Sequence, residues 1–231
     1  MSGWLARPLL AACRPATPGF LAVFFVLVTL GLQLWPGASE LLRFSRPSYA
    51  LGAFWQPLTS QWVHLTGWHA VGNALAFALI AVASSYWVRW PLQMLALLGG
   101  YAGVAVVVVL DPDCSYYAGA SGALHGLLAG NAVSFALGAG LLRRPAGEGG
   151  HCFSAPSPGC RLGLGAALLI FLALKLWLQS DGGLGATPSR WGFPVYRPAH
   201  CAGALGGLVL VFVASAWRAV AASKMHAESR Q

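Results

Sequence analysis

Long apolar segments alternate with short polar ones along most of this chain. Six of the apolar segments are about 17 to 23 residues long, enough to cross a hydrocarbon layer roughly 30 Å thick. They cover residues 18–35, 69–88, 91–110, 121–142, 162–178 and 199–221. Because lipid cannot satisfy open backbone groups, each segment is predicted to be an α-helix. The pattern therefore predicts an all-α integral membrane bundle of six transmembrane helices.

The composition supports a membrane protein and argues against a soluble one. The chain is 57% hydrophobic and only 9% charged, whereas soluble domains carry about 25% charged residues. Its net charge of +8 comes from basic residues that lie singly or in pairs between the apolar segments. Such a distribution sets membrane topology and does not predict nucleic-acid binding. No long polar stretch is left over, so residues 1–231 are expected to form a single domain embedded in the lipid bilayer.

The distribution of lysine and arginine predicts the orientation in the membrane. If the N-terminus is inside, nine basic residues fall on the inner side: Arg7, Arg14, Arg89, Arg143, Arg144, Arg161, Arg218, Lys224 and Arg230. Four fall on the outer side: Arg43, Arg46, Arg190 and Arg197. Both termini are therefore predicted to be cytoplasmic. Lys175 lies inside the fifth apolar segment and is expected to extend outward to the interface.

Polar side chains mark the predicted outer ends of the second, fourth and sixth segments. They are His69 and Asn73, then Ser121 and His125, then His200. Three helices that start from one face place these groups at one depth. Polar residues are costly inside a membrane, so they are candidates for function.

Ser121 would need a base to become a nucleophile, because a serine hydroxyl reacts poorly until its proton is removed. His200 is the leading candidate for that base, and His125, four residues after Ser121, is the alternative. His69, Asn73 and the backbone N–H of Ser121 could stabilise a developing oxyanion.

Glycines recur every four residues beside both candidate residues. Gly122, Gly126 and Gly130 follow Ser121, and Gly203 and Gly207 follow His200. Small residues at this spacing allow close helix packing. Each feature alone also has an ordinary explanation: a membrane serine often bonds its own helix, and a histidine at a helix end often lies at the interface.

Three motifs appear in one order along the chain. His64, His69 and Asn73 fit a pattern of two histidines and an asparagine around the second helix. A Gly-x-Ser-Gly motif reads Gly119-Ala120-Ser121-Gly122. An Ala-His-x-x-Gly-x-x-x-Gly motif covers residues 199–207 and contains His200, Gly203 and Gly207. Together they resemble the rhomboid family of intramembrane serine proteases, over most of the chain.

This resemblance implies a role for each residue. Ser121 and His200 would form a catalytic dyad without a carboxylate, and His69, Asn73 and the Ser121 N–H would form the oxyanion hole. The supporting residues would be His64, Gly119, Gly122, His125, Gly203 and Gly207. No metal or cofactor is expected.

Two departures narrow the branch of the family. Many rhomboids carry Trp-Arg in the first outer loop, but here the nearest acidic–basic pair is Glu40 and Arg43. His125 stands where bacterial rhomboids commonly have a tyrosine that stacks on the catalytic histidine. Ser-Gly-x-x-His-Gly at residues 121–126 is similar to the rhombosortase branch. That branch implies a bacterial inner membrane and client proteins with a C-terminal Gly-Gly motif, a hydrophobic helix and a basic tail.

Two alternatives to a protease stay open. One is an inactive rhomboid-like protein that only binds membrane clients, although such a protein would need neither Ser121 nor His200. The other is a metal or proton transporter lined by His64, His69, His125 and His200, although the scarcity of intramembrane carboxylates argues against it. A disulfide involving Cys114 or Cys201 is a further possibility on the outer side.

Overall fold

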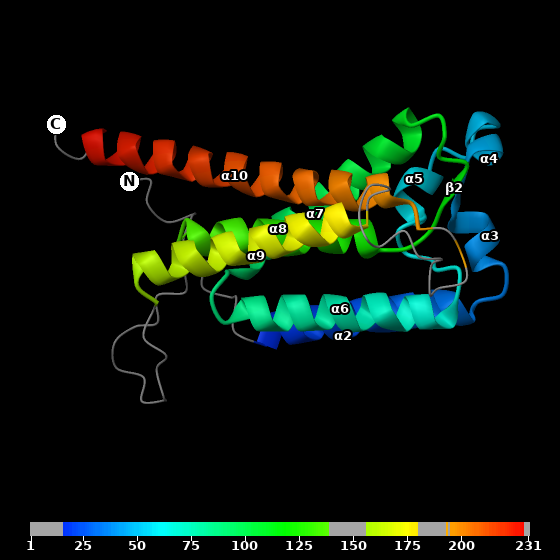
Figure 1. Cartoon of the computed structure of the whole chain (residues 1–231), viewed down its shortest axis with the longest axis horizontal. Coiled ribbons are helices and arrows are strands. Elements are labelled where there is room, and N and C mark those ends of the chain that lie inside the picture. Colours follow the sequence, from blue (N-terminus) through cyan, green and yellow to red (C-terminus); the bar gives the residue numbers. More distant parts are fainter. Residues whose placement is uncertain (1–15, 139–155, 180–192, 194, 229–231) are drawn as a thin grey trace, which may run out of the picture.

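The computed structural model describes residues 16–138, 156–179, 193 and 195–228. Within these ranges nine helices and two short strands follow one another (Figure 1). The long helices are α2 (Ala16–Leu34), α6 (Gly67–Ser85), α7 (Trp90–Leu110), α8 (Ser121–Ala136), α9 (Pro158–Leu178) and α10 (Arg197–Glu228). The short elements are α3 (Ala38–Leu42), β1 (Phe44–Ser45), α4 (Arg46–Ala50), α5 (Gln56–Thr59) and β2 (Tyr116–Tyr117).

Each of the six predicted apolar segments corresponds to one long helix, but not all are long enough to cross a membrane alone. Four described helices have both the length and the apolarity to do so, namely α6, α7, α9 and α10 up to Arg218. The apolar part of α2 is shorter, at Gly19–Leu34, and α8 has 16 residues. The prediction of six spans therefore stays a prediction for α2 and α8.

The helix ends differ from the predicted ones for local reasons. The helix predicted at residues 121–142 ends at Ala136, because Gly138 has a φ of 65° and turns the chain out of the helix. Residues 139–142 lie outside the described part of the chain. The last helix begins at Arg197, two residues early, with Pro198 in its first turn, where proline is well accommodated. It extends beyond the predicted residue 221 to Glu228, because residues 222–228 contain no glycine or proline that would end it.

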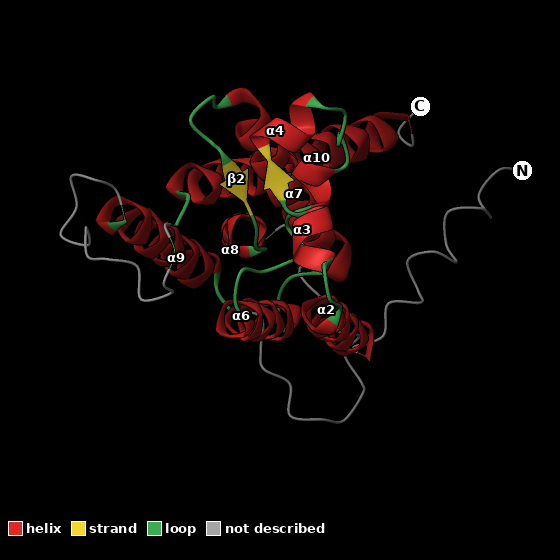
Figure 2. Ribbon diagram, turned by 90° about the vertical axis from the view of Figure 1, so that its right-hand side faces the viewer, coloured by secondary structure: helices red, strands yellow, loops and turns green. Residues whose placement is uncertain are grey.

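Helix α8 forms the centre of the bundle (Figure 2). Twelve of its 16 residues are buried. It packs against α7, α10, α9 and α6, while α2 packs against α6. Large apolar side chains such as Phe20, Leu79 and Trp217 are exposed on the outer helices. A polar solvent would not favour this surface, whereas hydrocarbon would, so the arrangement fits a multi-pass membrane protein.

Glycines allow the backbones of α7, α8 and α10 to touch. A Cβ atom on Gly203 of α10 would overlap the carbonyl of Gly122 on α8, and one on Gly207 would overlap the carbonyl of Gly126. Gly99 of α7 meets α10 in the same way. The glycine pattern on α8 and α10 therefore lies in the helix contact, and α7 contributes a third glycine face that the sequence analysis did not single out.

The short elements cover one end of the bundle (Figure 1). Strands β1 and β2 pair antiparallel, with Phe44 opposite Tyr117. This small sheet departs from the all-α prediction and joins the loop between α2 and α6 to the loop that precedes Ser121. Arg46 strengthens the junction, because its guanidinium donates to the carbonyls of Val108, Val109, Asp111 and Cys114 at the end of α7.

Candidate active site

The loop before α8 reaches Ser121 through a glycine whose backbone has a positive φ. Gly119 has a φ of 121°, which side chains rarely adopt, and its N–H donates to the carbonyl of Ser60 at 2.9 Å. A Cβ atom at Gly119 would lie 2.6 Å from Cε1 of His69. Glycine is thus required here for two reasons, the backbone angle and the close imidazole. Ser121 then becomes the first residue of α8.

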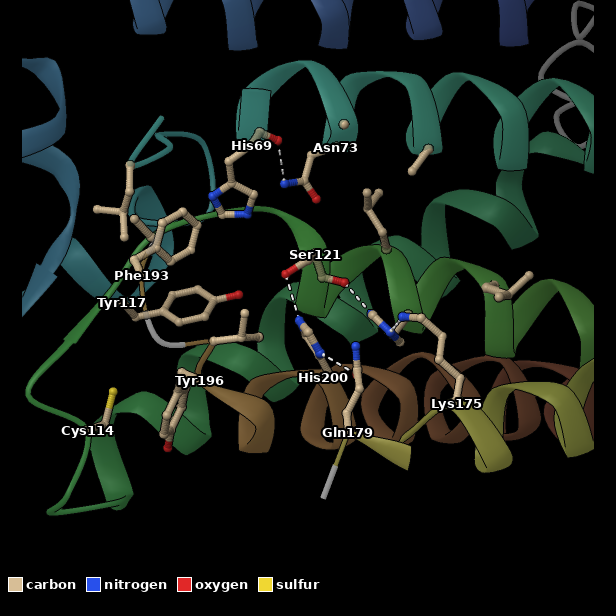
Figure 3. Close-up of a pocket in the computed structure, with 18 of the residues that line it drawn as sticks. His69, Asn73, Cys114, Tyr117, Ser121, Lys175, Gln179, Phe193, Tyr196 and His200 are labelled. Atoms are coloured by element: carbon tan, nitrogen blue, oxygen red, sulfur yellow. Dashed lines mark hydrogen bonds between the residues drawn. The ribbon is translucent and has the colours of Figure 1, made fainter. Parts of the chain in front are cut away.

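Ser121 and His200 form a direct hydrogen bond (Figure 3). The distance between Ser121 Oγ and His200 Nε2 is 2.8 Å. His200 is only 5% exposed and lies in the first turn of α10. The two residues are 79 positions apart in the chain, so this contact depends on the packing of α8 against α10. A serine whose hydroxyl contacts an imidazole nitrogen can be activated as a nucleophile.

The ring of His125 stacks on a face of the His200 ring. The two imidazoles are stacked, with centroids 4.3 Å apart and an angle of 15° between their planes. His125 Nδ1 contacts the carbonyl of Ser121 at 2.6 Å. His125 is thus tied to its own helix and packs on His200, and within the described part of the chain the Ser121 hydroxyl bonds His200 and not His125.

Helix α9 contributes two polar side chains to this pair of histidines. Gln179 Oε1 lies 3.1 Å from His200 Nδ1, and Lys175 Nζ lies 2.5 Å from His125 Nε2. The expectation that Lys175 extends outward to the interface is therefore wrong. A lysine inside an apolar helix needs a hydrogen-bond partner, and His125 on the neighbouring helix supplies one.

The opposite wall of the site comes from α6. Asn73 Nδ2 donates to the carbonyl of His69 at 3.0 Å and keeps a second amide hydrogen. His69 packs on the Gly119 backbone and also contacts the ring of Phe193, with centroids 5.0 Å apart. Both side chains line the same cavity as Ser121 and His200 (Figure 3).

His64 supports the wall from the loop before α6. Its ring meets His69 edge to face, with centroids 4.9 Å apart, and its Nε2 accepts a long hydrogen bond from the N–H of Ala120 at 3.5 Å. Burial, together with the nearby His69, lowers the pKa of His64 to about 3. The ring is therefore neutral at ordinary pH and can accept this bond.

Tyr117 is a polar group of the site that the sequence analysis did not single out. Its side chain is 4% exposed, and its hydroxyl points toward Ser121 (Figure 3). Burial raises the pKa of Tyr117 far above its ordinary value, so the phenol stays protonated. Little in the sequence pointed to Tyr117, because a tyrosine in a loop between two membrane helices is usually an interfacial residue.

These residues line a cavity of about 710 Å³. Apolar side chains such as Leu124, Leu128 and Phe171 line part of it, and Ser121, His200, Asn73 and Tyr117 are among its polar groups. A volume of this size accommodates several residues of a peptide. The possible disulfide is not formed between the described cysteines: Cys114 is a free buried thiol, and Cys201 is free and exposed.

The comparison with protein families identifies the chain. The family model described as Rhomboid domain matches residues 51–217. The chain belongs to the rhomboid family. No curated protein and no solved structure gave a significant match.

Family membership agrees with the apolar helices: rhomboids are multi-pass membrane proteins and typically intramembrane serine proteases, although inactive members exist. In this rhomboid, Arg46 rather than Arg43 anchors the loop between α2 and α6, and its guanidinium lies 5.0 Å from the ring centroid of Phe44. Phe44 and Arg46 thus form an aromatic–basic pair in the loop where the sequence analysis found no Trp-Arg.

Proposed function

We propose that this rhomboid is an active intramembrane serine endopeptidase, with Ser121 as nucleophile and His200 as general base. The observation that carries the proposal is the 2.8 Å contact between Ser121 Oγ and His200 Nε2 at the wall of a peptide-sized cavity. The chemistry needs no metal or cofactor, since an activated serine suffices for acyl transfer.

The reaction divides into two acyl-transfer steps. Ser121 Oγ attacks the scissile carbonyl carbon while His200 Nε2 takes the hydroxyl proton. The tetrahedral intermediate collapses when the C–N bond breaks and His200 returns that proton to the leaving amine. Water then attacks the acyl-enzyme, with His200 again acting as base, and releases the carboxylic acid product with Ser121 restored.

The oxyanion of each intermediate would be held by donors from α6 and from the start of α8. Asn73 has one amide hydrogen left after its bond to His69, and the ring of His69 lines the same cavity. The N–H of Ser121, at the N-terminus of α8, would be the third donor. Removing one such donor typically costs about 10²–10³ in rate.

The short central helix accounts for water reaching the reaction. With 16 residues, α8 is ~24 Å long at 1.5 Å per residue, less than the ~30 Å of hydrocarbon. Ser121 at its outer end would therefore lie below the membrane surface in a cavity that is open to the outer loops. Such a site admits water and an unwound stretch of a client helix.

Two other functions fit the geometry less well. An inactive client-binding rhomboid would not need a hydrogen-bonded serine and histidine. A histidine-lined transporter would need ligands directed at a common point, but His125 bonds the backbone of Ser121, and His200 bonds Ser121 and Gln179. The Ser121–His200 bond and the separate partners of the two histidines therefore favour a protease over both alternatives.

As clients, we propose secreted or surface proteins with a C-terminal anchor made of a Gly-Gly step, a hydrophobic helix and a basic tail. This corresponds to the rhombosortase branch, which the His125 replacement suggests, and to a bacterial inner membrane. Glycine is a poor helix former, so an anchor with glycines unwinds easily to present its peptide bond. With both termini of the enzyme cytoplasmic, the client's basic tail would stay on the cytoplasmic side and its glycines would lie level with Ser121.

The activity test uses purified protein and a serine-reactive fluorophosphonate probe, beside cleavage of a single-span reporter. Ser121→Ala and His200→Ala should each lose probe labelling and cleavage while still inserting into the membrane. Full cleavage by Ser121→Ala, in a host that lacks other rhomboids, would refute the mechanism. His125→Tyr should keep measurable activity, whereas His200→Tyr should not.

The client and the orientation are tested separately. A reporter with a Gly-Gly anchor should be cut faster than one whose glycines are replaced by leucine. Equal cutting of both would remove the rhombosortase assignment, and the proposed protease activity would still stand. A periplasm-active reporter fused after Gln231 should be silent, and an active one would reverse the orientation.

A further inference from the structure

Helix α9 presents two polar side chains to the catalytic centre from a single face. Lys175 and Gln179 are four residues apart, which places them on the same side of a helix. Lys175 contacts His125, and Gln179 contacts His200 (Figure 3). Most of α9 between Arg161 and Lys175 is apolar, and only Gly165 and Leu172 among its described residues are buried. Lys175 and the C-cap residue Gln179 are thus the polar groups that this end of the helix brings to the site.

The Ser121 carbonyl determines the direction of both hydrogen bonds that His125 makes. The carbonyl of Ser121 can only accept, so His125 Nδ1 must carry a hydrogen. A neutral imidazole then has a bare Nε2, which accepts from the ammonium of Lys175. His125 is thereby held in one orientation and one tautomer, flat against the His200 ring.

The same reasoning applies to His200. To take the proton of Ser121, its Nε2 must be bare, so a neutral ring carries its hydrogen on Nδ1. Gln179 Oε1, 3.1 Å away, is the acceptor that stabilises this tautomer. A glutamine oxygen offers a dipole where triad proteases offer a carboxylate, so it orients the ring without a full negative charge.

We propose that Gln179 and Lys175 are positioning residues, which set the tautomer of His200 and fix the His125 ring that packs on it. The active site is then assembled from α6, α8, α9 and α10, and the dyad acquires a neutral third member. The proposal rests on the proposed protease function for its rate effects, but the tautomer of His200 can be observed without any cleavage.

The kinetic test compares shape-matched variants in liposomes with a cleavable single-span substrate. Gln179→Met should lower kcat by about 3- to 10-fold with KM unchanged, as expected for one lost hydrogen bond. Gln179→Glu should restore kcat and move the acidic limb of the kcat/KM profile to higher pH, because a carboxylate stabilises the protonated ring. The other titratable groups that face His200 are His125, Lys175 and His69, and they are unchanged in both variants.

For Lys175 the matched pair is Lys175→Met, which should lower kcat, and Lys175→Arg, which should retain most of it. Leu174→Met, on the half-exposed neighbouring position, is the control and should leave kcat and KM unchanged. Wild-type kcat and an unshifted pH profile in Gln179→Met, Gln179→Glu and Lys175→Met would overturn the proposal.

The second readout is the ¹H–¹⁵N spectrum of histidine-labelled protein in detergent. A low-field Nδ1 proton, assigned to His200 by its loss in His200→Ala, should be present in the wild type and lost in Gln179→Met. Its absence from the wild type would refute the assigned tautomer. If the wild type neither cleaves substrate nor reacts with the fluorophosphonate, the protease function fails, and this spectrum still decides the positioning role.

Discussion

The contact between Gly203 and Gly122 sets the distance between nucleophile and base. Gly203 lies one turn after His200, and Gly122 directly follows Ser121. In Gly203→Ala the new Cβ atom would lie 2.5 Å from the carbonyl carbon of Gly122 and still closer to its oxygen. Ordinary contacts are 3.4–4 Å, and both helix backbones are rigid at this point. The helices must therefore separate by roughly 1 Å, because a packed core does not absorb an added methyl group.

This separation acts directly on catalysis. Added to the 2.8 Å between Ser121 Oγ and His200 Nε2, it gives roughly 3.8 Å, which is beyond hydrogen-bond distance. A misplacement of this size can cost about 10²-fold in rate. We therefore expect kcat/KM of Gly203→Ala to fall by about 10²-fold, measured on a single-span reporter in liposomes. Overpacking should also cost about 1–3 kcal/mol of stability, measured by thermal unfolding in detergent.

Gly163→Ala on α9 is the matched control, because a Cβ atom there would meet nothing within 4 Å. It should change kcat/KM by less than about twofold. The reasoning would be refuted by a Gly203→Ala protein that is folded and cleaves at the wild-type rate. A folded variant that is slow toward both substrate and fluorophosphonate would support it.

Three further predictions concern the loops around the site. Gly119→Ala should reduce cleavage by at least about 10-fold, because it combines a positive φ with a contact to His69; wild-type probe labelling would contradict this. Arg46→Met should lower the unfolding free energy by about 1.5–3 kcal/mol, since the carbonyls at the end of α7 lose a charged donor, whereas Arg46→Lys should lose less; equal melting temperatures for Arg46→Met and wild type would refute the role. The hydrogen bond from Tyr196 lowers the pKa of Asp111. This bond therefore stabilises the folded protein fully above the ordinary carboxyl pKa, and the stabilisation is lost as the pH falls through the lowered pKa. Tyr196→Phe should therefore melt lower near neutral pH and converge with wild type in acid, and a constant difference down to acidic pH would argue against this link.

Much of the bundle could be predicted from hydropathy alone. Six apolar segments became six helices because hydrocarbon leaves the backbone no other way to satisfy its hydrogen bonds. The spacing of Gly122 and Gly126 on one helix and of Gly203 and Gly207 on another predicted a close contact, and Ser121 and His200 beside these glycines predicted that the two side chains could meet. These inferences depend on local composition and spacing, which the sequence contains.

Other features were decided only by the tertiary structure. The sequence places Lys175 and Gln179 on one face of an apolar helix, but it does not say which way that face is turned. In the structure the face is turned toward His125 and His200, which supply the acceptor and the donor that these side chains need. Likewise, the carbonyls that bind Arg46 are available only where α7 ends beside the loop between α2 and α6. The physical reason is that a polar group in an apolar surrounding is stabilised by its partner, and here each partner comes from a part of the chain that folding alone brings near.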